Sequence, residues 1–184
     1  MVKSGTLIDA SLVEADGRRP RKGEPVEGRS DRDATWTAMK DEPLFGYKAH
    51  VAVDQGSGLV RRAILTPANV SDKTPFLALV QGDEQAVYAD KGYESRWFRE
   101  RLAEQGIADG VMRCDFHRRR LTPADHDRNR ALSRLRAPVE RSFALMKRWY
   151  GYRRVRYRSL RRNALQLQLL ACAMNLRRAL VLAG

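Results

Sequence analysis

The sequence predicts an α/β fold in which helices pack on the faces of a mixed β-sheet. Three patterns carry this prediction. Residues 45–66 alternate in the manner of strands around a glycine-containing turn, which is typical of a β-hairpin. Residues 85–112 follow the pattern of a strand, a helix and a further strand. Residues 160–182 form a long amphipathic segment typical of a helix. A hairpin joined to strands that alternate with helices implies a mixed sheet covered by helices.

The first part of the chain supplies most of the expected strands and one long loop. Residues 15–44 are rich in charged residues, Gly and Pro and have almost no apolar pattern, so we expect a long loop with solvated charges. The other elements expected here are a strand over residues 5–13, hairpin strands over 45–54 and 59–66 around a turn at 55–58, and a helix over 74–80 capped by Ser71 and Asp72.

The second part of the chain ends in helices. A short all-apolar strand over residues 85–89 suits the middle of a sheet. A helix capped by Ser95 is expected to carry Trp97, Phe98 and Leu102 toward that sheet. The remaining expected elements are a strand over residues 107–112, a helix from a capping box at Thr122 and Asp125 to about 135, a helix beginning at Pro138, and a final long helix over 160–182. We treat residues 1–184 as a single domain.

The charge of the chain points to a polyanionic partner. The formal net charge is +13 over 184 residues. Residues 113–162 hold 17 Lys and Arg against 4 Asp and Glu, whereas the rest of the chain is balanced. A concentrated excess of this kind indicates nucleic acid as a partner. Composition alone leaves open a basic surface without chemistry.

Cysteine usage and hydropathy exclude other classes. Cys114 and Cys172 form neither a metal-ligand pair nor a disulfide framework, which fits a reducing cytoplasm. The apolar stretch over residues 169–174 is far too short to cross a bilayer, so we expect no membrane partner. The three histidines lack zinc-ligand spacing.

Three acidic residues stand where metal ligands would be expected. Asp9 lies inside the first apolar strand, Asp90 follows the central strand, and Glu140 begins a helix in the basic region. In α/β sheets, sites form at the carboxyl ends of strands, which suits Asp90. Carboxylate oxygens are the ligands that Mg²⁺ prefers, and two such ions can drive phosphoryl displacement. The pattern therefore predicts Mg²⁺-dependent chemistry on a phosphate backbone.

Two basic residues flank Glu140. Lys147 follows it by nearly two helical turns and projects from the same face, where it would lie over the phosphate. Arg136 precedes Pro138 on the entering turn, poised over the same site. Each acid also has an ordinary interpretation. Asp9 could cap or pair locally, Asp90 could be a turn aspartate, and Glu140 could be a first-turn glutamate paired with Arg136.

Several short motifs carry a family resemblance. They are Thr6-Leu-Ile-Asp-Ala-Ser-Leu12, Phe45-Gly-Tyr-Lys-Ala-His-Val-Ala-Val-Asp54, Thr66-Pro-Ala-Asn-Val-Ser-Asp72, Tyr88-Ala-Asp-Lys-Gly-Tyr93, the spaced set Arg136, Glu140 and Lys147, Gly151-Tyr-Arg-Arg-Val-Arg-Tyr157, and Asn163. In these motifs the chain resembles the catalytic portion of bacterial insertion-sequence transposases of the DDE type, in the group named after insertion sequence five. The similarity covers nearly the whole chain in the right order.

The resemblance implies a fold, a cofactor and partners. It implies an RNase H-like fold with Asp9, Asp90 and Glu140 as the catalytic, metal-binding triad for Mg²⁺, with Mn²⁺ as an alternative. It also implies that Arg136 and Lys147 contact DNA near the cut. The partners implied are DNA, as element ends and target, and further copies of the chain, at least a dimer in the active complex.

The basic segment after Lys147 fits this expectation. Its arginines are suited to the DNA backbone and alternate with aromatic residues, of which Trp149 and Tyr150 are expected in the core. A solvated face is the alternative interpretation. The residues expected to bind DNA here are Arg148, Arg153, Arg154 and Arg156.

Two departures from the family pattern matter. Ser133 stands where the family usually has a tyrosine. The chain also begins just before the first catalytic strand, without the usual N-terminal helical region, so an upstream-frame product is a further expected partner. Two rival functions follow from the same residues. They are a structure-selective nuclease of this fold and a non-catalytic DNA-binding remnant of a truncated transposase.

Overall fold

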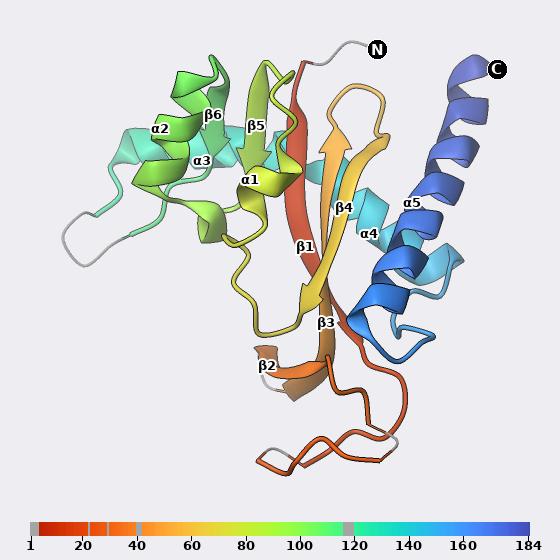
Figure 1. Ribbon diagram of the computed structural model, residues 1–184. Helices are drawn as coiled ribbons and strands as arrows, with labels where there is room; N and C mark the ends of the chain where they lie inside the picture. Colours follow the sequence, from red (N-terminus) through yellow and green to blue (C-terminus); the bar gives the residue numbers. More distant parts are fainter. Residues whose placement is uncertain (1–3, 22, 29, 40–41, 116–119) are drawn as a thin grey trace.

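The strands form one mixed sheet. The computed structural model describes residues 4–21, 23–28, 30–39, 42–115 and 120–184. Within these residues the sheet has six strands (Figure 1). The strands are β1 (Thr6–Glu14), β2 (Thr35–Met39), β3 (Glu42–Asp54), β4 (Val60–Pro67), β5 (Ala86–Ala89) and β6 (Ala108–Val111).

The pairing of the strands is antiparallel on one side of β1 and parallel on the other. β3 pairs antiparallel with β1, β2 and β4. β5 pairs parallel with β1 and with β6. Strands β3 and β4 form the predicted hairpin. The parallel strands β5 and β6 are joined by a crossover connection that contains the helix Arg96–Glu104. The prediction of a mixed sheet is therefore confirmed.

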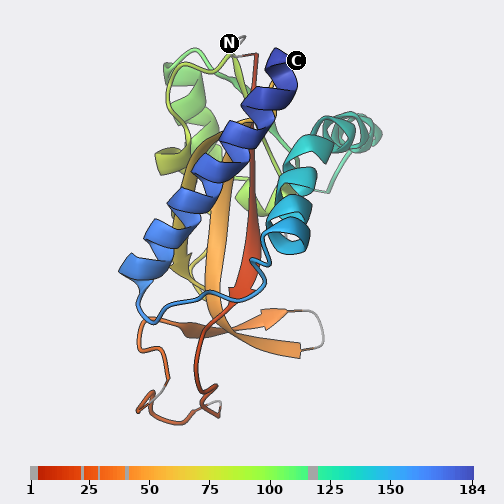
Figure 2. The same cartoon turned by 90° about the vertical axis from the view of Figure 1, so that its right-hand side faces the viewer.

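Helices cover both faces of the sheet, as predicted. α4 and α5 lie on one face, and α1 and α2 lie on the other (Figures 1 and 2). Among the described residues, no helix combines the length and hydropathy that a membrane span requires. The helices are α1 (Phe76–Leu79), α2 (Arg96–Glu104), α3 (Pro123–Leu135), α4 (Ala137–Trp149) and α5 (Leu160–Ala183), with a short 3₁₀ turn η1 (Lys91–Tyr93) after β5.

The side-chain alternation of β1 divides the core into two clusters. Leu7 packs with residues of α4 and α5, whereas Ile8 packs with residues of α1 and α2. Successive side chains of a strand point to opposite faces, so Asp9 shares the face of Leu7. The first strand therefore directs Asp9 toward α4.

The predicted starts of α3 and α4 are confirmed, whereas Ser95 precedes α2 without a capping hydrogen bond from its side chain. Thr122 and Asp125 form the expected capping box at the start of α3. α4 begins at Ala137 with Pro138 in its first turn, where a missing N–H costs nothing. In α2, Phe98 and Leu102 are buried as predicted, but the prediction for Trp97 is wrong because it is 51% exposed.

The segment expected to be a continuous loop contains β2. Residues 35–39 pair with residues 42–46 of β3, and the ring of Trp36 lies 5.4 Å from that of Phe45. The strand is missed in the sequence because charged residues flank its short apolar pattern. The prediction of an unbroken loop over residues 15–44 is therefore wrong for residues 35–39 and for residues 42–44, which belong to β3.

The same segment is tied to the start of α5 by two carboxylates, of which Asp31 is buried and Asp33 is exposed. Asp31 is 1% exposed, and its Oδ2 accepts hydrogen bonds from Tyr47 Oη at 2.7 Å and from Ser159 N at 3.2 Å. Asp33 Oδ2 accepts one from Leu160 N at 2.8 Å. These acceptors satisfy backbone N–H groups at a helix N-terminus, which have no partner within the helix. The expectation that the charges of this segment are solvated is wrong for Asp31.

Candidate functional site

Asp9 and Asp90 lie at equivalent points of two neighbouring strands. β1 and β5 are parallel, and Ile8 is paired with Ala89, so each aspartate directly follows a paired residue. Asp9 Oδ1 accepts a hydrogen bond from Ala10 N at 2.8 Å. Asp90 Oδ1 accepts one from Lys91 N at 2.6 Å and caps η1. The sheet thus brings together two carboxylates that are far apart in the sequence.

Arg136 joins these two carboxylates from the turn between α3 and α4. Its Nη2 lies 3.2 Å from Asp9 Oδ2, and its Nη1 lies 3.7 Å from Asp90 Oδ1. The residue is buried, with 7% of its surface exposed. A buried guanidinium needs partners of opposite charge, and the two aspartates supply them. Arg136 therefore points into the carboxylate pair, and its expected contact with DNA stays a prediction.

The electrostatics of Asp9 show that the third acid faces the same place. Burial raises the pKa of Asp9 above its usual range, although Arg136 and the Ala10 N–H act against that rise. The carboxylates of Asp90 and Glu140 raise the pKa of Asp9 further. Both other acids therefore act on Asp9 through space, and a cation beside Asp9 would relieve that repulsion.

Glu140 stays at the rim of this group. It lies in the first turn of α4 and is exposed. Among the residues that the structure describes, no set of three His, Cys, Asp or Glu side chains is close enough to hold one metal ion. The hard oxygen donors and mutual repulsion of the three acids nevertheless fit a divalent cation in chemistry. The sheet assembles the aspartate pair, and the assignment of Glu140 to the same metal site stays a prediction.

Lys147 lies further along α4, beside the continuation of β1. Burial, followed by the positive charge of Arg153, lowers the pKa of Lys147. The two side chains share a shallow hollow next to the first strand. Its lining consists of Ala10, Ser11, Leu12, Glu14, Leu44, Lys147 and Arg153.

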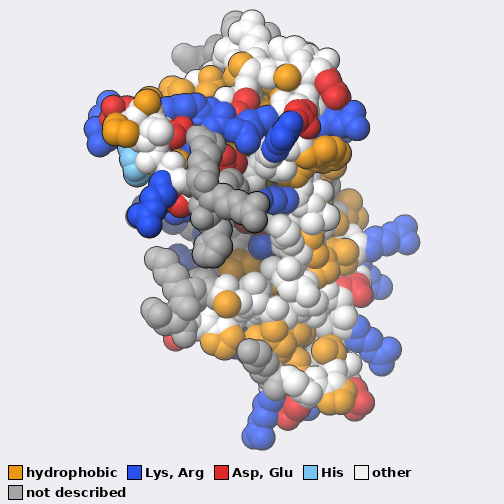
Figure 3. Space-filling view, turned by 90° about the vertical axis from the view of Figure 1, so that its left-hand side faces the viewer, with side chains coloured by type: hydrophobic (Ala, Val, Ile, Leu, Met, Phe, Trp, Pro, Cys, Tyr) orange, Lys and Arg blue, Asp and Glu red, His pale blue; other side chains and the backbone are white. Residues whose placement is uncertain are grey.

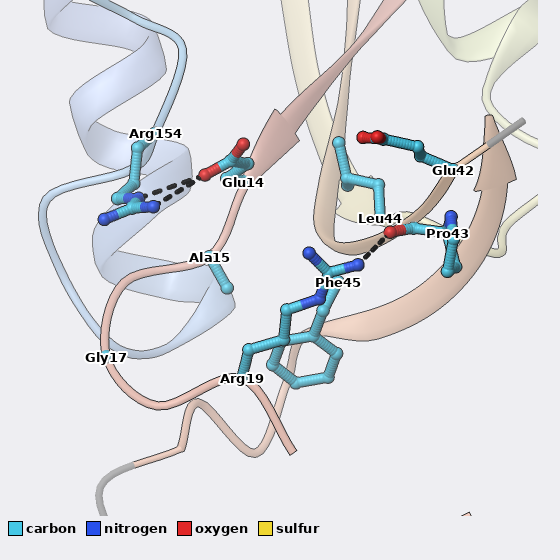
Figure 4. Close-up of a pocket in the computed structure, with 9 residues that line it drawn as sticks. All are labelled: Glu14, Ala15, Gly17, Arg19, Glu42, Pro43, Leu44, Phe45 and Arg154. Atoms are coloured by element: carbon cyan, nitrogen blue, oxygen red, sulfur yellow. Dashed lines mark hydrogen bonds and ion pairs between the residues drawn. The ribbon is translucent and has the colours of Figure 1, made fainter. Parts of the chain in front are cut away.

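The segment after α4 docks against the end of β1. Glu14 N donates to Arg153 O at 2.9 Å, and Val155 N donates to Glu14 O at 2.9 Å. Arg154 extends toward Glu14, and its Nη2 lies 2.7 Å from Glu14 Oε2 (Figure 4). All four expected DNA ligands of this region, Arg148, Arg153, Arg154 and Arg156, are exposed, and Arg154 is paired with a carboxylate. Sequence reasoning missed Glu14, whose partner lies 140 residues away.

The aromatic residues of this segment do not all follow the prediction. Trp149 is 60% exposed, and the Arg177 guanidinium lies 3.8 Å from its ring centroid. The expectation that Trp149 belongs to the core is therefore wrong, because it ends α4 on the side away from the sheet. Tyr150 packs partly against the core, and Tyr152 is buried.

A buried tyrosine beside the site was also missed. Tyr93 is 1% exposed, and its hydroxyl has no hydrogen-bond partner among the described residues. Burial raises its pKa, and the carboxylates of Asp72, Asp9 and Asp90 raise it further. The signal available in the sequence was its position three residues after Asp90.

Other basic side chains are paired locally. On the edge formed by α2, β6 and α3, acidic side chains lie among the basic ones (Figure 3). The ion pairs on these elements and the adjoining segment include Arg96–Glu100, Arg101–Glu104, Arg113–Asp109 and Arg130–Asp127. This edge is therefore partly neutralised by its own carboxylates.

Comparison with known proteins gives two solved structures of low similarity. The cryo-EM structure of the piggyBac transposase synaptic complex with hairpin DNA has a TM-score of 0.42 and 15% identity, covering 66% of this chain and 25% of that one. The crystal structure of the catalytic core domain of BIV integrase has a TM-score of 0.35 and 11% identity, covering 89% of this chain and 95% of that one.

Comparison of sequences is more specific. The transposase for insertion sequence element IS1106 of Neisseria meningitidis serogroup B is 34% identical over 188 residues, which is 96% of this chain and 65% of that protein. This chain thus spans about two-thirds of the length of that relative. The narrower group named after insertion sequence five stays a prediction. The family model described as "Transposase DDE domain" matches residues 1–176. The chain therefore belongs to the DDE transposase family.

Proposed function

We propose that this chain cuts DNA strands at the ends of an insertion sequence and joins them to target DNA by metal-dependent phosphoryl transfer. One observation carries the proposal. Asp9 and Asp90, contributed by distant segments, meet where the parallel pairing of β1 with β5 ends, and a buried Arg136 offsets part of their charge. Such a concentration of carboxylate charge on the face toward a basic helix suits the binding of cations and phosphates together.

Asp9, Asp90 and Glu140 are the residues that would hold Mg²⁺ or Mn²⁺. A bound divalent ion would polarise the phosphate and stabilise the leaving oxygen. The chain's own contribution is the position of the donors. The sheet fixes the two aspartates, and Glu140 on the first turn of α4 would supply the third carboxylate.

The basic residues near this site would position the DNA backbone. Lys147 and Arg153 share the hollow beside β1, a short distance along the strand from Asp9. Arg148 and Arg156 are exposed on the same segment and add sequence-independent attraction for phosphates. Arg154 can join them only by leaving Glu14. The proposed path of the DNA therefore follows α4 and the segment after it.

The substitution Asp90→Asn tests the catalytic proposal. It removes a ligand charge but keeps the size of the side chain. We expect Mg²⁺-dependent cleavage to fall at least a hundredfold, roughly the loss that follows removal of one essential catalytic charge, while DNA binding stays within about twofold. Asp127→Asn on α3 is the matched control, because Asp127 is an exposed aspartate paired only near the surface with Arg130. Cleavage by Asp90→Asn at the rate of the control would refute the assignment.

One observation favours a different function. Because Arg136 is paired with both aspartates and occupies the space between them, the chain could bind DNA without cutting it. A non-catalytic binder would show a steep salt dependence of DNA affinity and no cleavage with Mg²⁺ or Mn²⁺. An assay with a pre-cut 3′ end separates the remaining alternative. Hydrolysis without joining of that end to a second duplex would identify a nuclease.

A further inference from the structure

The outer face of α5 carries a line of exposed leucines. Leu165, Leu169, Leu176 and Leu180 are 61%, 63%, 70% and 76% exposed. Cys172 is exposed as well and lies in the middle of the line. These positions follow one another at intervals of three or four residues, so they share one face of the helix. We call this set the α5 leucine face.

The α5 leucine face has no role in the core. The opposite side of the helix packs on the sheet through Leu167, Ala171 and Met174. α5 is the outermost layer on its side of the sheet (Figures 1 and 2). A helix that needed only one apolar side would place polar residues outward. A continuous exposed apolar line of this kind marks an interaction surface.

The spacing of the face makes it complementary to itself. Leu169 and Leu176 lie three and four residues from Cys172, and Leu165 and Leu180 lie seven and eight residues from it. If a second α5 ran in the opposite direction, Leu165 would oppose Leu180 and Leu169 would oppose Leu176. A two-fold axis would then pass beside Cys172. Self-complementarity about one axis is the requirement for a symmetric dimer.

The charges select the antiparallel arrangement. α5 contains four arginines and no acidic residue, with Arg161 and Arg162 exposed at its start. Parallel helices would bring these arginines together. Antiparallel helices would instead place them beside the last turn of the partner helix, where free carbonyl groups and the helix dipole are negative.

The two remaining arginines do not interrupt the face. Arg177 lies over the ring of Trp149, and Arg178 Nε donates to Ser57 O at 2.7 Å. Both are thereby directed toward the body of the same molecule. We propose that α5 pairs with the α5 of a second copy of this chain in antiparallel orientation, through the α5 leucine face.

This inference adds a partner surface to the proposed function without depending on its chemistry. A dimer would carry two catalytic groups on one assembly, as joining two DNA ends requires. The face lies on α5, whereas the proposed metal ligands lie on β1, after β5 and on α4. Self-association can therefore be measured without DNA or metal, so that failure of one proposal is separate from failure of the other.

The first test is self-association of the intact chain, measured by sedimentation equilibrium over a range of concentrations. We expect a dimer for the unchanged chain. The double substitution Leu169→Gln with Leu176→Gln should weaken its association roughly a hundredfold or more, since four buried leucines are lost per dimer. The control is Leu135→Gln with Leu145→Gln, which changes two leucines that are 39% and 40% exposed on other helices.

A monomer at all concentrations would overturn the proposal, as would a dimer that survives the change at Leu169 and Leu176. Circular dichroism of both variants shows whether they keep the helical content of the unchanged chain. If the Leu169 and Leu176 variant loses that content, the cross-linking below decides the matter in the otherwise unchanged chain.

The second test measures orientation by cross-linking. In a background of Cys114→Ser, a short bis-maleimide should link Cys172 to Cys172 of the second copy. In a background that lacks both cysteines, a mixture of the Leu165→Cys and Leu180→Cys chains should give the mixed cross-link. Leu165→Cys alone should give little. Preferential linkage of Leu165→Cys to itself would establish parallel helices, and absence of every cross-link would exclude this face.

Discussion

Replacing Asp31 should destabilise the protein strongly, although this residue lies in a segment that reads as a loop. Its carboxylate is almost fully buried and accepts hydrogen bonds from Tyr47 Oη, Ser159 N and Asp33 N. Asp31→Ala removes all three interactions at once. The hydroxyl of Tyr47 and the amide of Ser159 then lose this buried acceptor. The substitution therefore removes one link of this segment to β3 and one of its two links to the start of α5.

The expected size follows from the three bonds. A hydrogen bond to a charged group contributes about 1.5–3 kcal/mol, and the carboxylate's own burial offsets part of their sum. Removing one member of a buried charged network typically costs about 3–5 kcal/mol. We expect Asp31→Ala to lower the free energy of unfolding by about 3–4 kcal/mol. Tyr47→Phe removes one of the three bonds and should cost about 1–2 kcal/mol.

Urea unfolding of both variants and of the double variant measures these values. Because Tyr47 and Asp31 share one hydrogen bond, the double variant should cost less than the sum of the two single changes. Asp16→Ala in the same segment is the control, since the side chain of Asp16 is half-exposed. A decrease in the free energy of unfolding below about 1 kcal/mol for Asp31→Ala would refute the reasoning. Water would then have replaced the lost hydrogen bonds at almost no cost in stability.

Three further predictions concern pH, metal binding and DNA binding. Burial lowers the pKa of His50 from 6.5 to about 4. The neutral form of His50 therefore stabilises the fold fully above pH 6.5. As the pH falls from 6.5 toward 4, the free energy of unfolding should decrease by up to about 3 kcal/mol. His50→Gln should flatten that acid dependence in thermal unfolding; an unchanged slope would contradict it. Arg136→Gln should strengthen Mn²⁺ binding in calorimetry while DNA cleavage falls, and unchanged Mn²⁺ affinity would argue against a shared site. Arg153→Ala should reduce the salt slope of DNA binding by about one. Arg154→Ala should change the salt slope much less, because Arg154 is paired with Glu14. Equal effects of the two substitutions would indicate that both arginines contact the DNA.

The sequence predicted the parts of the fold whose signals are local. The hairpin strands carry alternating side chains around a turn, and the capping box and Pro138 mark helix starts, so β3, β4, α3 and α4 are found where expected. β2 escaped because its pairing depends on Trp36 meeting Phe45, a contact that no pattern within residues 35–39 reveals. Asp31 escaped for the same reason. Its burial depends on Ser159, 128 residues later.

The residues of the candidate site also differ in whether local sequence patterns reveal them. Asp9 and Asp90 could be proposed because each stands in or after an apolar strand, and the parallel pairing of β1 with β5 brings them together. The sequence predicted Arg136 near this site only as a DNA ligand. Its spacing from Glu140 does not indicate which groups its side chain contacts. The orientation of the Arg136 side chain follows from its burial at the start of α4. The carboxylates within reach of the buried guanidinium are those of Asp9 and Asp90.

That orientation carries a physical consequence for catalysis. Burial makes the ionised form of Asp9 costly, and Arg136 offsets part of that cost. A divalent ion placed between Asp9 and Asp90 would supply the same compensation with twice the charge, so the guanidinium would no longer be needed there. It would then be free to meet the phosphate that such an ion polarises. We therefore propose that the ion pair of Arg136 with the two aspartates and its expected contact with DNA are alternative arrangements, and the Mn²⁺ affinity of Arg136→Gln tests this proposal.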